Sequence, residues 1–481
     1  MLPPAREGRN RLNAALNASR RTLVLVVALM AVGAVARVAF VVATPNYAPQ
    51  TDSRDYLRLA RAIARNGAYP RRQVWITQRH CPRVSGFPRT PCVARPRARG
   101  ARLITKGDAY RPPGYPYALA LPALLARWVG DGLALARGFQ VLIGVIVVGL
   151  VGLLGRMLWG RRVGLIALGL AAVYIPLVLV SSVVISEPLY TALMLGAICA
   201  VLRWRRHGGL PMLVAAGMLA GLTALTRENG VVVLVGVAAL AVTGRDSRGW
   251  LCRLRAPLLV MAVGVLTIAP WTIRNAVVMG GFLPISDESG PTLVGTYNPL
   301  SQANRSEPGS WTGHVSRIAP YKEIFIQAPA HSQIVLGNIM EHYAITYAVD
   351  HPAYIGTVFW QNTLRLLELH GTARIRWGAG TIGLPPSAAV DGAIMFYCVA
   401  LLALAGVFVP ATRRVPRALW IIPALQFLTT VLANAETPRF RTPLEPFILL
   451  LAAVSLDYFT TLAWPHLTRR RLPAFSVRTT R

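Results

Sequence analysis

Lysine, acidic residues and cysteine are scarce in this sequence. Only Lys106 and Lys322 are lysines among 51 basic residues, and 19 acidic residues leave a formal net charge of +32. Five cysteines without a C-x-x-C pair are too few for a disulfide framework or a zinc ribbon, and no H-E-x-x-H motif is present. No cofactor and no structural metal are therefore expected, and the metal requirement stays open. The arginines are scattered between apolar runs, so the charge does not indicate a nucleic-acid partner.

The sequence contains long apolar runs and few charged residues. The 481 residues are 54% hydrophobic and only 15% charged, and their mean hydropathy is +0.46. These values exclude an ordinary soluble domain and predict an all-α polytopic membrane protein, since about 20 apolar residues cross the hydrocarbon core as a helix. About ten spans are predicted, at residues 22–44, 133–155, 163–181, 187–203, 210–226, 230–243, 256–275, 391–410, 418–434 and 446–463.

Arginine clusters at alternate connections set the predicted orientation. By the positive-inside rule the tails 1–21 and 464–481 are cytoplasmic, in a multi-pass protein of the plasma membrane. The predicted divisions are a membrane domain 22–275 with a first outer loop 45–132, a second outer segment 276–390, and C-terminal spans 391–463. The short apolar stretches 115–129 and 354–369 are predicted to be interfacial helices. Because the long segments lie outside, the functional site is expected on the extracytoplasmic side.

The first outer segment is rich in arginine, contrary to the positive-inside rule that the other connections follow. Between Pro45 and Pro113 it carries fourteen arginines and Lys106, against three aspartates. Either arginine is simply abundant and tolerated in a long translocated loop, or several guanidiniums hold a phosphate through paired hydrogen bonds. Cys81 and Cys92 in the same segment are candidates for a disulfide.

Residues 51–66 have the periodicity of an amphipathic helix. Tyr56, Leu59, Ala60 and Ile63 form an apolar stripe, and arginines form the opposite one. Asp52 lies at the start of this helix on the apolar side. Its carboxylate is either an N-cap for free backbone N–H groups or a general base held at the membrane surface.

Several motifs occur in the order typical of one enzyme superfamily. They are D-S-R-D-Y at 52–56, G-A-Y at 67–69, R-P-P-G-Y-P at 111–116, S-E-P-L-Y at 186–190, L-T-R at 225–227, P-W-T-I-R-N at 270–275 and R-F-R-T-P-L-E-P at 439–446. Together these motifs resemble the membrane glycosyltransferases of the GT-C superfamily. The R-P-P-G-Y-P element is similar to that of glycosyltransferase family 39, which includes protein mannosyltransferase and aminoarabinose transferase relatives.

The resemblance implies a GT-C fold and transfer of a sugar from a polyprenyl-phosphate donor to a glycan, lipid or protein acceptor at the outer face. Asp52 matches the catalytic aspartate, which would take the proton of the acceptor hydroxyl. Asp55 and Asp108 are further carboxylates for the catalytic group. The lipid phosphate and its surroundings would be bound by Tyr56 and by arginines, of which Arg111 is the first candidate, Arg274 the second, and Arg439 and Arg441 further ones that alternatively bind membrane lipid headgroups.

Two departures from the family pattern affect the substrate prediction. Ser53 follows Asp52 where the aminoarabinose and protein-mannosyl branches tend to have glutamate, and Tyr110 replaces the acidic residue before the double proline. The resemblance is therefore to the broad bacterial group of relatives, with sugar and acceptor undefined. Glu187 is expected to begin a helix, and Arg227 is expected to pair with Glu228.

Two other functions remain open. A transporter or flippase of a lipid-linked or anionic substrate would also need about ten spans and basic clefts. Transporters commonly have a two-fold repeat and several charges at mid-membrane. This sequence has no convincing repeat, and Arg37 is its main mid-span charge. A non-catalytic scaffold could bind anionic lipid through the arginine surplus. Only a transferase would turn over a sugar donor without an ion gradient.

Overall fold

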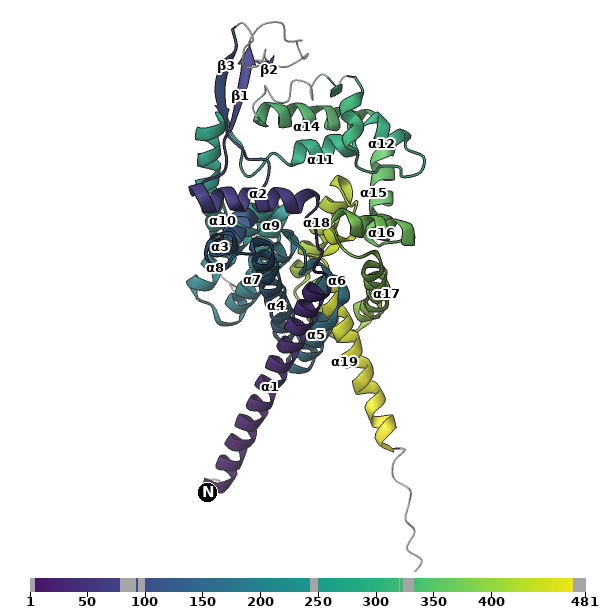
Figure 1. The fold of residues 1–481 in the computed structure, drawn as a ribbon. Coiled ribbons are helices and arrows are strands. Elements are labelled where there is room, and N and C mark those ends of the chain that lie inside the picture. Colours follow the sequence, from purple (N-terminus) through teal and green to yellow (C-terminus); the bar gives the residue numbers. More distant parts are fainter. Residues whose placement is uncertain are drawn as a thin grey trace, which may run out of the picture.

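The computed structural model describes residues 5–77, 92–93, 100–242, 250–319, 321–322 and 333–469 and is predominantly helical (Figure 1). Long helices form a bundle, and the described residues of the segments 44–113 and 280–385, here called the cap, lie at one end of it (Figure 1). The described chain ends, on α1 (Ala5–Ala43) and α19 (Glu445–Arg469), lie at the opposite end. This is the arrangement that the predicted topology requires.

Each predicted span falls on a helix or on a pair of helices. Besides α1 and α19 these are α4 (Gly132–Trp159), α5 (Arg161–Val173) with α6 (Ile175–Val180), α7 (Glu187–His207), α8 (Leu210–Thr226), α9 (Val231–Val242), α10 (Trp250–Met279), α17 (Pro386–Phe408) and α18 (Ile421–Ala433). Of the helices in the described residues, 5 are long and apolar enough to cross a membrane, and α8, α9 and α18 are shorter apolar helices. The multi-pass class is confirmed, while the number of ten spans stays a prediction.

The predicted span 163–181 is broken between α5 and α6. Pro176 lies in the first turn of α6, and Tyr174 leaves the helical conformation with a ψ of 108°. Arg37 on α1 is fully buried and donates to the carbonyl oxygens of Ala171 (3.4 Å) and Ala172 (3.2 Å) at the end of α5. The mid-span arginine thus satisfies carbonyl groups that the break leaves without helical partners.

Small residues let the helices of the bundle approach closely. A Cβ atom at Gly221 on α8 would lie 2.7 Å from the carbonyl oxygen of Gly264 on α10. Such close backbone approach is typical of helix pairs in membranes, where packing rather than the hydrophobic effect drives association.

The helix α2 (Thr51–Asn66) has the bounds expected from its periodicity. Tyr56, Leu59, Ala60 and Ile63 are buried, and the arginines of the opposite stripe are exposed. The apolar stripe packs against α3 (Gly114–Val129) and the bundle rather than against lipid. Because α2 is fixed along its buried side, its first turn is held rigidly at the end of the bundle.

The cap also contains a small antiparallel sheet that the all-α expectation missed. Its strands are β1 (Arg72–Thr77), β2 (Cys92–Val93) and β3 (Arg102–Lys106), in the order β2-β1-β3. Ile76 pairs with Arg102 and with Val93 on its two neighbours. Alternating Val74 and Ile76 were the available signal for a strand, but the surrounding arginine-rich sequence obscured it.

The second cap segment is mainly helical. It contains α11 (Ser289–Thr296), α12 (Pro299–Ala303), α14 (Gln333–Asp350), α15 (Pro352–Leu366) and α16 (Thr372–Thr381). The helix expected at 354–369 is α15, shifted by two or three residues, whereas α14 was not predicted. Tyr354 and Val358 of α15 are buried in a core that belongs to the cap, so much of this helix packs on protein rather than lying free at the membrane surface.

Candidate active site

Arg111 lies where the loop before α3 meets α2 and the second cap segment. Its Nη2 atom is 2.5 Å from Oδ1 of Asp52 and 3.2 Å from Oδ2 of Asp55. Its Nη1 atom is 2.5 Å from Oε1 of Glu288, the residue that precedes α11. One guanidinium therefore joins three parts of the chain, and Asp52 and Arg111, selected from separate sequence motifs, are in direct contact.

The other oxygen of Asp52 accepts a hydrogen bond from Arg439. Arg439 belongs to the short helix η5 (Pro438–Arg441), and its Nε atom lies 3.7 Å from Oε1 of Glu187. Arg227 donates to the same Glu187 oxygen at 2.8 Å. Positive and negative groups thus alternate from α2 to α7 and the end of α8. We call this set the Asp52 network: Asp52, Asp55, Arg111, Glu187, Arg227, Glu288 and Arg439.

Two local interpretations of the sequence are wrong here. Gln50 is the N-cap residue of α2, and Asp52 directs its carboxylate to the arginines instead of capping the helix. Arg227 pairs with Glu187 rather than with its chain neighbour Glu228. Glu187 does begin α7 as expected, but it is buried and paired with charge. Tertiary contacts between helices replaced the nearest partners in the sequence.

The aromatic side chains of α2 and α3 form the floor beneath Arg111. The guanidinium carbon lies 5.4 Å from the ring centre of Tyr56 and 4.9 Å from that of Tyr110. Tyr56 is buried edge-to-face against Tyr115, with centroids 4.8 Å apart, and donates to Ser186. These contacts fix the orientation of Arg111 without occupying its hydrogen-bond donors.

Each of the two arginines that bind Asp52 has an Nε atom that makes no hydrogen bond to the described residues, although Nε of Arg439 lies at ion-pair distance from Glu187. The Nε atoms of Arg111 and Arg439 are buried and have no hydrogen-bond partner within the part of the chain that the structure describes. A buried donor without an acceptor costs free energy. An anion whose oxygen reached either atom would supply the missing acceptor.

Electrostatics keep Asp52 ionised in this arrangement. Burial by itself raises the pKa of a carboxyl group, but the Arg439 and Arg111 guanidiniums outweigh burial and hold the pKa of Asp52 well below its usual range.

The residue before Asp52, Thr51, has a φ of 33°, a conformation that a β-branched residue rarely adopts. Such strain is common at functional sites, where surrounding contacts maintain it.

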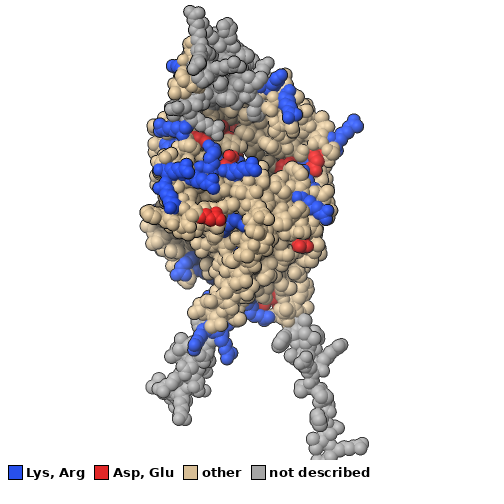
Figure 2. Space-filling model, viewed as in Figure 1, with Lys and Arg blue, Asp and Glu red and all other residues tan. Residues whose placement is uncertain are grey.

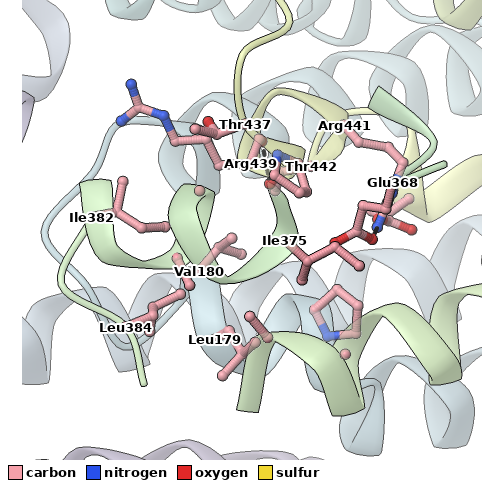
Figure 3. Close-up of a pocket in the computed structure, with 17 residues that line it drawn as sticks. Leu179, Val180, Glu368, Ile375, Ile382, Leu384, Thr437, Arg439, Arg441 and Thr442 are labelled. Atoms are coloured by element: carbon pink, nitrogen blue, oxygen red, sulfur yellow. Dashed lines mark hydrogen bonds and ion pairs between the residues drawn. The ribbon is translucent and has the colours of Figure 1, made fainter. Parts of the chain in front are cut away.

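A cavity of about 550 Å³, including the open space at its mouth, lies next to Arg439. Figure 3 shows apolar side chains of α6 and of the α16 region, among them Leu179, Val180, Ile375 and Ile382, on its walls. Thr437 and Arg439 lie along another side, and the side chain of Arg439 extends away from the apolar walls (Figure 3). The cavity therefore has an apolar part and a cationic edge that is shared with the Asp52 network.

Arg441 borders the same cavity, but each of its three nitrogen atoms donates to a protein group. Its Nε atom donates to Glu445 at 2.5 Å, Nη1 to the carbonyl oxygen of Leu366 at 2.8 Å, and Nη2 to Glu368 at 3.0 Å. Tyr174 donates to the other oxygen of Glu445 at 2.6 Å. We call Arg441, Glu368, Glu445 and Tyr174 the Arg441 network. Its donors are used by protein groups, which gives Arg441 a framework role.

Asp108 and Arg274 lie together, in a group separate from Asp52. Arg274 donates to the carbonyl oxygen of Asp108 at 3.0 Å and stacks on Trp271, 4.6 Å from the ring centre. The Asp108 carboxylate accepts from the backbone of Tyr110 at 3.1 Å and from Gln333 at 3.3 Å. These contacts hold the loop that presents Arg111, and they use Asp108 and Arg274 as supports of that loop.

Buried acids form a third group beside the network. Ser286 donates to Glu228 at 2.5 Å, and the backbone N–H of Glu288 lies 3.3 Å from the same oxygen. Burial and the neighbouring Glu288 raise the pKa of Glu228 to about 7. Burial, with Glu228 and Glu341 nearby, raises the pKa of Asp287 to about 8. The contact between the cap and the end of α8 therefore carries protons near neutral pH.

Cys81 lies outside the described residues, so the Cys81–Cys92 disulfide stays a prediction. Glu288 was missed because no motif marks it. Glu187 and Arg227 belong to motifs that were recognised, but their pairing with each other was not predicted.

Comparisons with known proteins agree with this architecture. Residues 110–273 match the sequence profile of the family described as dolichyl-phosphate-mannose-protein mannosyltransferase. No curated protein matches the chain. The oligosaccharyltransferase of Archaeoglobus fulgidus, solved with a tethered acceptor peptide, aligns with a TM-score of 0.51 at 15% identity over 95% of this chain and 52% of its own.

Two further solved structures are similar. AglB of Archaeoglobus fulgidus, in complex with an inhibitory peptide and a dolichol-phosphate, aligns with a TM-score of 0.52 at 14% identity over 96% of this chain and 53% of its own. ArnT of Cupriavidus metallidurans, bound to undecaprenyl phosphate, aligns at 14% identity over 96% of this chain and 82% of its own, with a TM-score of 0.38 that is too low to support the fold assignment. The chain spans about half the length of the archaeal proteins.

The fold is similar to that of these two archaeal oligosaccharyltransferase structures, in agreement with the GT-C fold that the sequence motifs implied. The match to the protein-mannosyltransferase family is confined to residues 110–273.

Proposed function

We propose that the protein transfers a sugar from a polyprenyl-phosphate donor to a hydroxyl group of an acceptor, with Asp52 as the general base. The reaction takes place in the cap, on the extracytoplasmic side of the plasma membrane. The single observation that carries this proposal is the position of Asp52 between two arginines, one of which, Arg439, lines a partly apolar cavity.

The cavity fits a donor that is apolar at one end and anionic at the other. Its apolar walls would take the first part of the polyprenyl chain, because each CH₂ left in water costs about 0.8 kcal/mol. The phosphate would then lie at the cationic edge formed by Arg439, beside the end of the bundle. There an arginine can be anchored in protein and still reach a hydrated headgroup.

Arg111 is the second group suited to the phosphate. Its Nε donor is unused, and its Nη1 atom is held by Glu288, whose carboxylate is partly exposed. A phosphate has the charge and the acceptor oxygens to displace this carboxylate. When the donor binds, its phosphate would replace the carboxylate of Glu288 as the partner of Arg111.

The chemical step uses both charges of the network. The acceptor oxygen attacks the anomeric carbon, its proton passes to Asp52, and the bond between the anomeric carbon and the phosphate oxygen breaks with its electron pair left on the phosphate. Arg439 and Arg111 stabilise the charge that grows on the phosphate during this step.

The same arginines also adjust the strength of the base. While both bind Asp52, its pKa is held low and it is a weak base. When a donor phosphate draws either guanidinium to itself, the pKa of Asp52 rises and the carboxylate accepts a proton more readily. Donor binding therefore prepares the base.

Other selected residues have supporting roles in this proposal. Asp55 is 3.2 Å from Arg111 and more exposed than Asp52, which suits a group that orients the arginine. Asp108 and Arg274 hold the loop before α3, and Tyr56 supports Arg111 from below. Arg441 positions the wall of the cavity through its carboxylate partners.

The test is donor turnover by purified protein in detergent micelles, without any gradient. Polyprenyl-phosphate monosaccharides are supplied with an acceptor extract, and release of polyprenyl phosphate is measured by mass spectrometry. We expect Asp52→Asn to lower the rate by about 10² or more, the usual contribution of a general base. Asp131→Asn is the matched control, because Asp131 caps α4 with its side chain and asparagine caps equally well.

Size-exclusion profiles identical to wild type would show that both variants are folded. A rate for Asp52→Asn within about tenfold of wild type would refute Asp52 as the base. Absence of turnover, combined with movement of the donor across proteoliposome membranes, would instead support the transporter alternative.

A further inference from the structure

One face of α2 carries arginines that the Asp52 network does not use. Arg54, Arg58, Arg61 and Arg65 are exposed, and Figure 2 shows basic side chains gathered in a band over α2, below a hollow in which acidic side chains are visible. Arg54 donates to the carbonyl oxygen of Pro49 at 2.7 Å, and Arg58 lies 3.6 Å from Asp108. Within the described chain, neither Arg61 nor Arg65 has a carboxylate at ion-pair distance.

An exposed apolar surface lies next to this basic band. On α3 the side chains of Leu121, Leu125 and Val129 are exposed, and Trp128 is 88% exposed. The opposite side of α3 is buried against α2 and the bundle. Arg127 on α3 donates to a carbonyl oxygen of α2, so the two helices are fixed side by side.

The two surfaces together have the chemistry of a membrane boundary. Exposed leucine and tryptophan side chains in one patch require a hydrocarbon environment or a partner. Cations directly beside such a patch lie at the depth of lipid phosphates, and tryptophan is enriched at that depth. A soluble polyanion would meet the arginines but would leave the apolar side chains in water. The adjacency of the two surfaces therefore favours lipid.

We propose that Arg61 and Arg65 of α2, with the exposed side of α3, form a docking edge for anionic phospholipid headgroups in the leaflet on the cap side. The lipid phosphates bind the guanidiniums, and their acyl chains contact Leu121, Leu125 and Trp128. Because Asp52 lies in the first turn of the same helix, this edge sets the depth of Asp52 relative to the membrane surface. The inference does not depend on the sugar-transfer proposal.

The experiment measures lipid retention by native mass spectrometry. Full-length protein is reconstituted in nanodiscs with equal amounts of phosphatidylglycerol and phosphatidylcholine, released into detergent, and the bound lipids are counted. The test variant is Arg61→Gln with Arg65→Gln. The matched control is Arg305→Gln with Arg317→Gln, which also removes two exposed positive charges from the cap but belongs to its second segment, not to α2 or α3.

We expect the test variant to lose at least about half of the phosphatidylglycerol that wild type retains in excess over phosphatidylcholine, since each arginine supplies a separate favourable contact with the anionic surface. The control should retain the wild-type amount. Retention unchanged in the test variant, or an equal loss in the control, would overturn the proposal. So would unchanged lipid retention with a loss of heparin binding, because that result would assign the arginines to a soluble anion.

Discussion

Arg439 and Arg441 lie two residues apart on η5 and border the same cavity, yet they belong to different networks. Arg441 is 1% exposed, and its three donor positions are taken by Glu445, Glu368 and a backbone carbonyl group. Arg439 is 11% exposed, and its Nε atom has no hydrogen-bond partner among the described residues. Protein groups accept hydrogen bonds from all three nitrogens of Arg441, whereas Arg439 has a nitrogen that could still donate to a ligand.

Charge and burial alone do not show which of the two arginines is structural and which is available to a ligand. Both arginines bind carboxylates, and neutralising partners raise the pKa of each. The difference lies in what the partners can do. The carboxylates of the Arg441 network are buried and anchored, whereas Asp52, Asp55 and Glu288 remain between 21% and 38% exposed and can exchange their contacts with an incoming anion.

Replacement of Arg441 should lower the stability of the protein far more than replacement of Arg439. Arg441→Gln leaves Glu368 and Glu445 buried without their cation, and a broken buried pair typically costs about 3–5 kcal/mol. Arg439→Gln should cost much less stability and should mainly reduce turnover. Thermal unfolding in detergent, with expression yield, measures both variants.

A rescue variant serves as the control for this prediction. Adding Glu368→Gln and Glu445→Gln to Arg441→Gln removes the uncompensated charges and should restore part of the lost stability. Equal stability of Arg441→Gln and Arg439→Gln would contradict the division into two networks.

Replacement of Arg111 should impair donor binding much more than replacement of Arg274. Arg111→Ala should lower kcat/KM for the donor by about 10- to 100-fold, because hydrogen bonds to charged groups contribute about 1.5–3 kcal/mol. Arg274→Ala should act only through the loop and leave the donor KM within about threefold. Steady-state kinetics with varied donor decide between them, and the reverse order would place the phosphate beside Arg274.

The acids between the cap and α8 should make stability depend on pH. Because burial raises the pKa of Glu228 to about 7 and that of Asp287 to about 8, the folded protein holds protons that the unfolded chain has released. Stability should therefore fall as pH rises from about 4 through 8. Glu228→Gln should reduce this decline by on the order of 1 kcal/mol.

Unfolding temperatures of wild type and Glu228→Gln between pH 5 and 9 provide the measurement. Asp131→Asn, which changes an exposed helix cap instead, should follow the wild-type profile. A parallel decline in Glu228→Gln would show that the proton is held elsewhere.

The smallest expected effect concerns Glu288. Since its carboxylate occupies an Nη atom of Arg111 that the donor phosphate would use, Glu288→Gln should lower the donor KM by about two- to fivefold, the range of a partly exposed ion pair. Donor titration measures the change against Glu307→Gln, which removes a cap carboxylate that pairs with Arg365 and Arg374 instead. A raised KM would mean that Glu288 supports Arg111 rather than competing for it.

The sequence by itself determined the membrane class, the apolar spans and the helix 51–66, because these depend on local periodicity and on the length of apolar runs. The order of short motifs also selected Asp52, Arg111 and Arg439, which the structure brings into one network. It did not rank Arg439 above Arg441, and it made Arg274 the second candidate for the phosphate, whereas in the structure Arg274 donates to the carbonyl oxygen of Asp108.

Only the tertiary structure decided which charges are free. Glu288 lies 177 residues from Arg111, and Arg439 lies 387 residues from Asp52. No local pattern encodes such pairings, since they arise when the cap closes over the ends of the helices. The strands β1–β3 and the partner of Arg227 depended on the same long-range contacts. Chain neighbours at a helix end point in different directions, and so the nearest charge in the sequence was not the nearest in space.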